Sequence, residues 1–111
     1  MKMAVDKSLV SGSTAMLLLK LLSEKDMYGY EMIENLRLRS ENIFELKEGT
    51  LYPLLHRLEK QGHLKSYTKK TDQNRQRKYY QITKKGMKLL ESEKESFEHF
   101  SEAVLKVVNF A

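Results

Sequence analysis

Positively charged side chains are concentrated in one third of this chain. Residues 60–88 contain ten Lys or Arg and a single acidic residue, Asp72, for a net charge of +9. Residues 1–59 carry −1 and residues 89–111 carry −3, so the whole 111-residue chain carries +5. A cationic block of this kind can neutralise phosphate groups and indicates a polyanion as partner. The alternative is a solvated lysine-rich surface that binds nothing, and charge alone does not separate the two.

Side chains capable of catalysis or metal binding do not gather into a recognisable site. The three histidines, His56, His63 and His99, lie in different predicted elements and lack the spacing of metal ligands. Cysteine is absent, which excludes disulfides, thiolate zinc sites and cysteine nucleophiles and fits a reducing cytoplasm. No nucleophile elbow and no phosphate-cradling glycine loop is present. We therefore predict a protein that is not an enzyme and holds no metal or cofactor.

An amphipathic helix is predicted directly before the cationic block, in GTLYPLLHRLEKQG. Pro53 places its start near Gly49 or Thr50, and Gly62 marks its end. Its apolar stripe consists of four leucines at offsets of 0, 3, 4 and 7: Leu51, Leu54, Leu55 and Leu58. If this is a recognition helix, its N-terminal part enters the major groove. The candidate DNA contacts on it are Gly49, Thr50, Tyr52, Pro53, His56, Arg57 and Lys60.

These assignments have structural alternatives. Thr50 can merely cap the helix, and Tyr52 can pack against the connector that precedes it, from Ser40 to Glu48. Arg57 can pair with Glu59 or Glu34 instead of with a phosphate.

Two strand-like runs, LKSYT and RKYYQIT, follow the helix and are joined by the polar loop KKTDQNRQ. Alternation along both runs predicts a hairpin with one face on the helices and one in solvent. Such a wing lies along a minor groove or the backbone and supplies affinity more than sequence choice. The alternative is a solvated tip without contacts. The predicted phosphate contacts are Lys69, Lys70, Arg75, Arg77 and Lys78. Tyr28 and Tyr30 are further candidates through their hydroxyls, with core packing as the alternative.

Two more helices are predicted ahead of the recognition helix. The first is leucine-rich, starts at Ser11 or Ser13 and continues through AMLLLKLLSEK. The second starts after Asp26 as its N-cap and covers YGYEMIENLRLR. The longest apolar run, from Met16 to Leu22, is too short to span a bilayer, so we expect no membrane partner.

A long helix is predicted from Lys84 or Lys85 to about Val108. Its charged middle, ESEKES, is followed by an apolar stripe that needs a surface to bury against. A second copy of the chain is the simplest answer, and folding back as a third core layer is the alternative. The predicted dimer interface consists of Leu17 and Leu21 from the first helix and Phe97, Phe100, Val104, Val107 and Val108.

The order of elements predicts a mainly α fold with a small β-hairpin. In this fold, residues 1–83 form a winged helix-turn-helix DNA-binding domain and residues 84–111 form a dimerisation helix. Three motifs carry a resemblance: MYGYEMIENL (Met27 to Leu36), KEGTLYPLLHRLEKQGHL (Lys47 to Leu64) and RKYYQITKKG (Arg77 to Gly86). With the first helix they cover roughly residues 12 to 90. On these residues the chain resembles the smaller branch of the PadR family of bacterial transcriptional regulators.

The resemblance implies a cytoplasmic homodimeric repressor that binds double-stranded DNA at an inverted repeat near a promoter. Family members are often released by small aromatic or lipophilic ligands. Many carry a tryptophan at the end of the first wing strand, where this chain has Tyr67 and Thr68, and drug-binding relatives use one on the C-terminal helix. This chain has no tryptophan, and Phe97 or Phe100 can take that place. The runner-up function is a winged-helix module for protein–protein assembly, which has no need for the cationic block.

Overall fold

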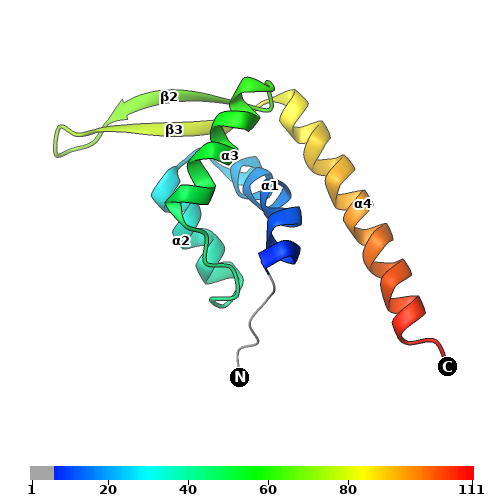
Figure 1. The fold of residues 1–111 in the computed structure, drawn as a ribbon. Helices are drawn as coiled ribbons and strands as arrows, with labels where there is room; N and C mark the ends of the chain where they lie inside the picture. Colours follow the sequence, from blue (N-terminus) through cyan, green and yellow to red (C-terminus); the bar gives the residue numbers. More distant parts are fainter. Residues whose placement is uncertain (1–6) are drawn as a thin grey trace.

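The computed structural model of this chain describes residues 7–111, with side chains from residue 12 onward. It is mainly helical with one small antiparallel sheet, which confirms the predicted winged helix-turn-helix class (Figure 1). The elements follow in the order α1 (Lys7–Glu24), β1 (Met27–Tyr28), α2 (Gly29–Arg39), α3 (Glu48–Lys60), β2 (Leu64–Lys70), β3 (Gln76–Ile82) and α4 (Lys84–Val108).

The leucine-rich α1 forms the centre of the molecule. It packs between α4 on one side and α2 and the sheet on the other (Figure 1). Four of its leucines are almost fully buried, which agrees with an apolar pattern that runs around the helix: Leu18, Leu19, Leu21 and Leu22. The stripe of α3 joins this core through Leu51, Leu54, Leu55 and Leu58, all of which are buried. Burial of these side chains is the main stabilising term for a domain of this size.

The sheet has three strands rather than the two of the predicted hairpin. Its order is β1-β3-β2, and the short β1 pairs Met27 with Tyr80 and Tyr28 with Tyr79. The prediction of Asp26 as the N-cap of the second helix is therefore wrong, because β1 intervenes and Tyr28 occupies the N-cap position of α2. A two-residue strand is too short to show the alternation that identifies strands in a sequence.

The start of α1 differs from its prediction, whereas the bounds of α3 lie close to theirs. Helix α1 begins at Lys7, so Ser11 and Ser13 lie inside it and do not cap it. Once a helix has nucleated on a well-packed segment, each further residue extends it at little cost, and serines are then tolerated. Helix α3 begins at Glu48, just before the predicted start near Gly49 or Thr50, and ends at Lys60. Gly62, the predicted terminator, follows shortly after this end with a φ of +84°.

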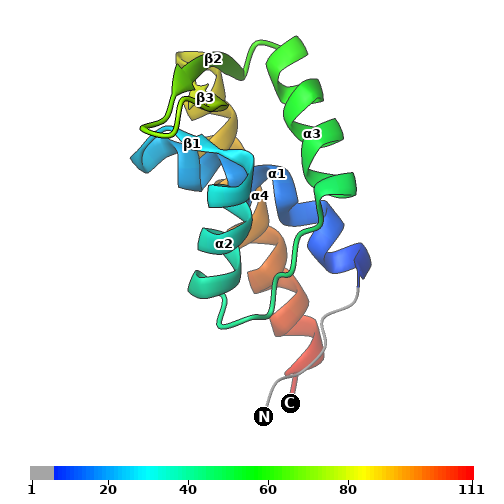
Figure 2. The ribbon, with the colours of Figure 1, turned by 90° about the vertical axis from the view of Figure 1, so that its left-hand side faces the viewer.

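Helix α4 leaves the domain after its first turns (Figure 1), and in the view of Figure 2 it runs behind α1 toward the C-terminus. Leu90 is buried and Leu89 is partly buried against the core, whereas the side chains of the C-terminal stripe are exposed. The alternative of a helix folded back as a third core layer is therefore wrong for this stripe. Leu21, which was predicted at the dimer interface, is 1 % exposed because it packs inside its own chain, and Leu17 is partly buried against the same core. Within residues 7–111, no helix has the length and apolar character needed to cross a membrane.

Candidate nucleic-acid interface

The solvent side of α3 presents every residue that was predicted to contact DNA on this helix. The four buried leucines hold the opposite side against the core, and this fixes which side faces outward. Arg57 and Lys60 lie in the last turns, next to the start of the wing. The exposed side chains and backbone positions are Gly49, Thr50, Tyr52, Pro53, His56, Arg57 and Lys60.

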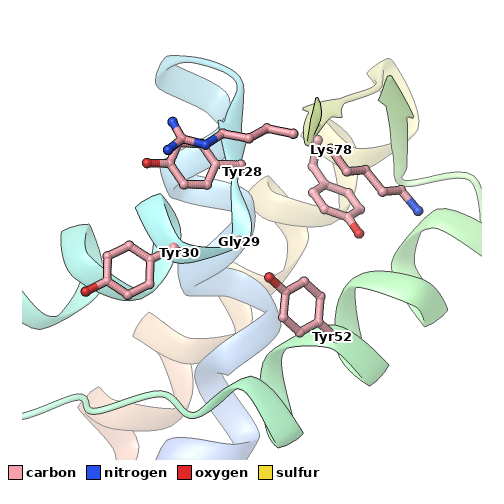
Figure 3. A pocket seen from close by; sticks show the side chains of 7 residues that line it. Tyr28, Gly29, Tyr30, Tyr52 and Lys78 are labelled. Carbon is pink, nitrogen blue, oxygen red and sulfur yellow. The ribbon is translucent and has the colours of Figure 1, made fainter. Parts of the chain in front are cut away.

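The structure also tests the structural alternatives for Thr50 and Tyr52 on α3. Lys47 occupies the N-cap position, so the alternative in which Thr50 merely caps the helix is wrong. Tyr52 points toward Gly29 at the start of α2, where its ring lies so close that a Cβ on Gly29 would be 2.8 Å from the Tyr52 Cζ (Figure 3). Tyr52 as a residue is nevertheless 44 % exposed. The Tyr52 phenol therefore stands at the junction of α2 and α3 rather than against the connector.

Neither carboxylate that was offered as a partner for Arg57 is paired with it. Glu34 accepts hydrogen bonds from Arg37, with Arg37 Nη2 at 2.9 Å. Glu59 accepts a hydrogen bond from the Ser66 hydroxyl at 2.5 Å and lies 3.7 Å from Lys78 Nζ. Arg57 is exposed, so its guanidinium is available to an external anion.

The wing projects from the domain as the paired strands β2 and β3 (Figure 1). Its turn is closed by Thr71, whose N–H donates to the Arg75 carbonyl at 2.7 Å, and Asn74 adopts a φ of +60°. Asparagine tolerates that left-handed conformation better than most residues. The predicted phosphate contacts on the wing are all exposed: Lys69, Lys70, Arg75, Arg77 and Lys78.

Three of these wing cations already have partners within the chain: Lys78, Arg77 and Lys69, whose Nζ lies over the ring of Tyr79. Lys78 faces α3, pairs with Glu59 and lies 5.4 Å from the ring centroid of Tyr80. Arg77, on the other face, has its guanidinium 4.4 Å from the centroid of the Tyr28 ring. Tyr28 is half-buried in β1, which places its ring beside the wing instead of in the core.

A groove of about 430 Å³ lies where α2, α3 and β3 meet (Figure 3). Burial raises the pKa of the Tyr52 phenol, and Glu48 and Tyr80 add to the effect, so this hydroxyl stays neutral and can donate at physiological pH. Phenol hydroxyls beside two cations are suited to binding phosphate oxygens. The groove is lined by Tyr28, Gly29, Tyr30, Tyr52, Arg77, Lys78 and Tyr80.

The groove includes two residues that were not predicted as contacts, Gly29 and Tyr80, beside Tyr30, whose hydroxyl was predicted to reach phosphate or whose ring was to pack in the core. Three tyrosines within a few positions of the recognition-helix motifs, at 28, 30 and 52, were the available signal. These three tyrosines come together because of the way α2 crosses α3. That crossing cannot be predicted from the spacing of residues within either helix.

Comparison with known proteins agrees with this geometry. The family described as "Transcriptional regulator PadR-like family" matches residues 18–92. An uncharacterized protein from Lysinibacillus sphaericus is 38 % identical over 82 residues, which cover 74 % of this chain and 75 % of that protein.

Solved structures show the same fold over nearly the whole chain. A transcriptional regulator from Clostridium thermocellum superposes with a TM-score of 0.86 at 35 % identity, over 93 % of this chain and 100 % of the other. A PadR-like transcriptional regulator from Bacillus cereus reaches 0.81 at 30 % identity, over 95 % and 100 % of the two chains. The chain therefore belongs to the PadR-like family, whose members are DNA-binding transcriptional regulators and not enzymes.

Proposed function

We propose that this chain is a cytoplasmic homodimeric repressor that binds an inverted-repeat operator. The observation that carries the proposal is the exposed polar side of α3 next to a cationic wing, in a domain whose basic residues gather there. In this arrangement the start of α3 reads base edges, and the wing adds salt-dependent affinity through phosphates. Bound to a promoter, a dimer would exclude polymerase, which makes repression the simplest mechanism.

The dimer part of the proposal rests on the C-terminal half of α4. Its stripe consists of Phe97, Phe100, Val104, Val107 and Val108, which are between 39 % and 78 % exposed. Apolar side chains exposed in a continuous stripe favour association with a complementary surface. A second copy presents the same stripe, and antiparallel or crossed packing would bury both at once. Two recognition helices held in this way would enter successive major grooves roughly 34 Å apart.

Release by a small aromatic or lipophilic ligand is the last part of the proposal. Phe97 and Phe100 are the exposed aromatic side chains of the stripe that such a ligand could contact. A ligand bound between the two α4 helices would lower DNA affinity only if it favours a dimer geometry that misplaces the recognition helices. Titration of planar aromatic compounds into the protein–operator complex, read by loss of anisotropy, tests this part separately.

The test of DNA binding is fluorescence anisotropy with duplex from upstream of the gene, at several salt concentrations and with random duplex as competitor. We expect binding that outcompetes random DNA and weakens with salt at a slope of about −0.9 per phosphate contact. Replacing Arg57 or Lys60 with Ala should reduce the slope by about one if the side chain contacts a phosphate. Lys94→Ala, an exposed lysine on α4, is the matched control and should change little.

Two other outcomes would redirect the proposal. Equal affinity for both duplexes would indicate sequence-independent packaging. Absence of binding at moderate salt would favour the protein–protein assembly module.

Sedimentation of the wild type and a Phe100→Glu/Val104→Glu variant tests the dimer. We expect the wild type to sediment as a dimer and the variant as a monomer, because two buried carboxylates would oppose association. His99→Glu is the matched control, since residue 99 lies outside the stripe, about 120° around the helix from its centre, and it should remain dimeric. A double variant that stays dimeric would place the interface elsewhere.

A further inference from the structure

The sheet face turned away from α3 carries a continuous row of three tyrosines. The strand register places Tyr79 directly opposite Tyr28 on β1 and opposite Tyr67 on β2. The rings of Tyr67 and Tyr79 stack with centroids 5.7 Å apart and an interplanar angle of 12°. Tyr28 meets Tyr79 edge to face, with centroids 5.5 Å apart and an angle of 75°. Both geometries are favourable for aromatic pairs, so the row links all three strands.

One end of this tyrosine row is tied to the helical domain. The Tyr67 hydroxyl donates a hydrogen bond of 2.7 Å to Oδ2 of Asp26, in the segment between α1 and β1. The two residues are 41 positions apart, and the contact bridges the outer wing strand β2 to the connection that leads into α2. Because β1 is only two residues long, its own ladder to β3 is short. The Asp26–Tyr67 hydrogen bond therefore adds an attachment between the wing and the domain on the sheet face turned away from α3, in addition to the contacts of Ser66 and Lys78 with Glu59.

Two wing cations rest on the same row. The Arg77 guanidinium lies over the Tyr28 ring, and Lys69 Nζ is 5.9 Å from the centroid of Tyr79. Lys69 and Arg77 are register partners, one step nearer the hairpin tip on this face than Tyr67 and Tyr79. The rings thus limit the directions in which these two side chains can extend. Both residues are among the phosphate contacts of the proposed function.

The contacts of the tyrosine row favour a structural role, in which it holds the wing in place. They do not favour a role as a stacking platform for an aromatic ligand or an unpaired base. A base-stacking platform presents free ring faces to its ligand. Here Tyr67 and Tyr79 cover each other, Arg77 covers Tyr28, and the Tyr67 hydroxyl is engaged by Asp26.

We propose that Asp26 and Tyr67 are positioning residues that set the angle of the wing relative to α3, through the tyrosine row. The inference rests on the proposed DNA-binding function and adds that residues outside the DNA-facing side of α3 determine how well the wing reaches the duplex. Asp26 is the informative member of the pair, because its charge and its hydrogen bond act on DNA affinity in opposite directions.

The test compares the DNA affinities of Asp26→Ala and Tyr67→Phe with that of the wild type, using the upstream duplex and the anisotropy assay. Removing a carboxylate from a DNA-binding protein should strengthen binding if charge alone matters. The positioning role predicts the reverse: both variants bind more weakly, by up to about fivefold, which is the factor that corresponds to the whole free energy of one ordinary hydrogen bond. Both should also show a shallower salt dependence, by about one phosphate contact, because the wing is no longer held on the duplex.

Two controls separate positioning from general stability. Asp26→Asn removes the charge but retains an oxygen that can accept from Tyr67, so its affinity should equal or exceed that of the wild type. Glu24→Gln removes a neighbouring carboxylate and weakens its exposed pair with Arg39, without a contact to the wing, so its affinity should also equal or exceed that of the wild type. The Asp26→Ala/Tyr67→Phe double variant should bind no more weakly than either single variant, because both remove the same contact.

The outcomes distinguish this inference from the proposed function. If the wild type binds the duplex and Asp26→Ala binds equally well or more tightly, the positioning role is overturned while DNA binding stands. A lower melting temperature with unchanged affinity and salt slope would overturn it in the same way. If the wild type does not bind DNA, both proposals fail. Tyr67→Phe leaves the chain's charge unchanged and affects an exposed side chain, so it remains a valid test if Asp26→Ala does not fold.

Discussion

Gly86→Ala tests how α4 is joined to the winged domain. Gly86 is buried in the first turn of α4, where its N–H donates to the Thr83 hydroxyl oxygen at 3.0 Å. A methyl group at this position would meet the backbone carbonyl oxygen of His63 and would lie 2.7 Å from Cγ1 of Ile82. The His63 carbonyl also accepts hydrogen bonds from the Thr83 N–H and hydroxyl, so it is not free to move aside.

Two opposing effects set the size of the change. Alanine is favoured over glycine by about 1 kcal/mol inside a helix. Overpacking a close contact costs about 1–3 kcal/mol when backbone must shift. Because the nearest obstacle here is a backbone carbonyl, we expect the second effect to dominate and the variant to be about 1–2 kcal/mol less stable. For a domain of this size that corresponds to a fall in Tm of roughly 4–10 °C.

Thermal unfolding followed by circular dichroism measures this difference, at one fixed protein concentration so that any dimerisation contributes equally. Gly12→Ala provides the matched control, because a Cβ at Gly12 in α1 has no atom within 4 Å. The same substitution there should raise stability by up to about 1 kcal/mol. A Gly86→Ala protein as stable as the wild type would refute the reasoning, since α4 could then move away from His63 without cost.

Three further predictions concern the core, a helix cap and a phenol. Leu55 is fully buried, so Leu55→Ala should lower the free energy of unfolding, measured in urea, by about 2–5 kcal/mol. Leu38 is exposed, so Leu38→Ala should lower it by less than about 0.5 kcal/mol. Thr83→Ala removes the side-chain cap of α4 and should cost about 1 kcal/mol, while Thr83→Ser should retain most of that stability. The hydrogen bond to Asp26 raises the pKa of the Tyr67 phenol. The stability that this hydrogen bond gives to the folded protein is therefore complete below a pH of about 10 and is lost as pH rises through the folded-state pKa. The wild-type minus Tyr67→Phe difference in phenolate absorbance should therefore have a midpoint above about 10, and a lower midpoint would contradict the hydrogen bond.

Several elements of this protein could be predicted because their signals are local. The leucine stripe of α3 repeats within a single helix, so its buried and exposed sides follow from the sequence alone. The alternation in LKSYT and RKYYQIT identified β2 and β3, and the buried Tyr80 beside the half-buried Tyr79 matches opposite-facing neighbours on a strand. The C-terminal helix ends at Val108, as its pattern predicted.

Other features could not be predicted, because they depend on residues that are distant in the sequence. Strand β1 is defined by its partners on β3, about fifty positions away, and carries no period of its own. Asp26 looked like a helix cap, but the sheet register brings Tyr67 to it and gives it another role. Leu21 and Phe100 are both apolar residues on helices, and only the packing of α1 at the centre buries the first and leaves the second exposed.

The sequence by itself thus determined the fold class, the family resemblance, the cationic block and the side of α3 that faces outward, since helical and strand periods act over a few residues. The tertiary structure alone decided which tyrosines converge on the groove between α2, α3 and β3, which wing cations rest on aromatic rings, and where the wing is tied to the domain. Those arrangements follow from strand register and helix crossing, which bring together side chains from distant segments only after the core has packed.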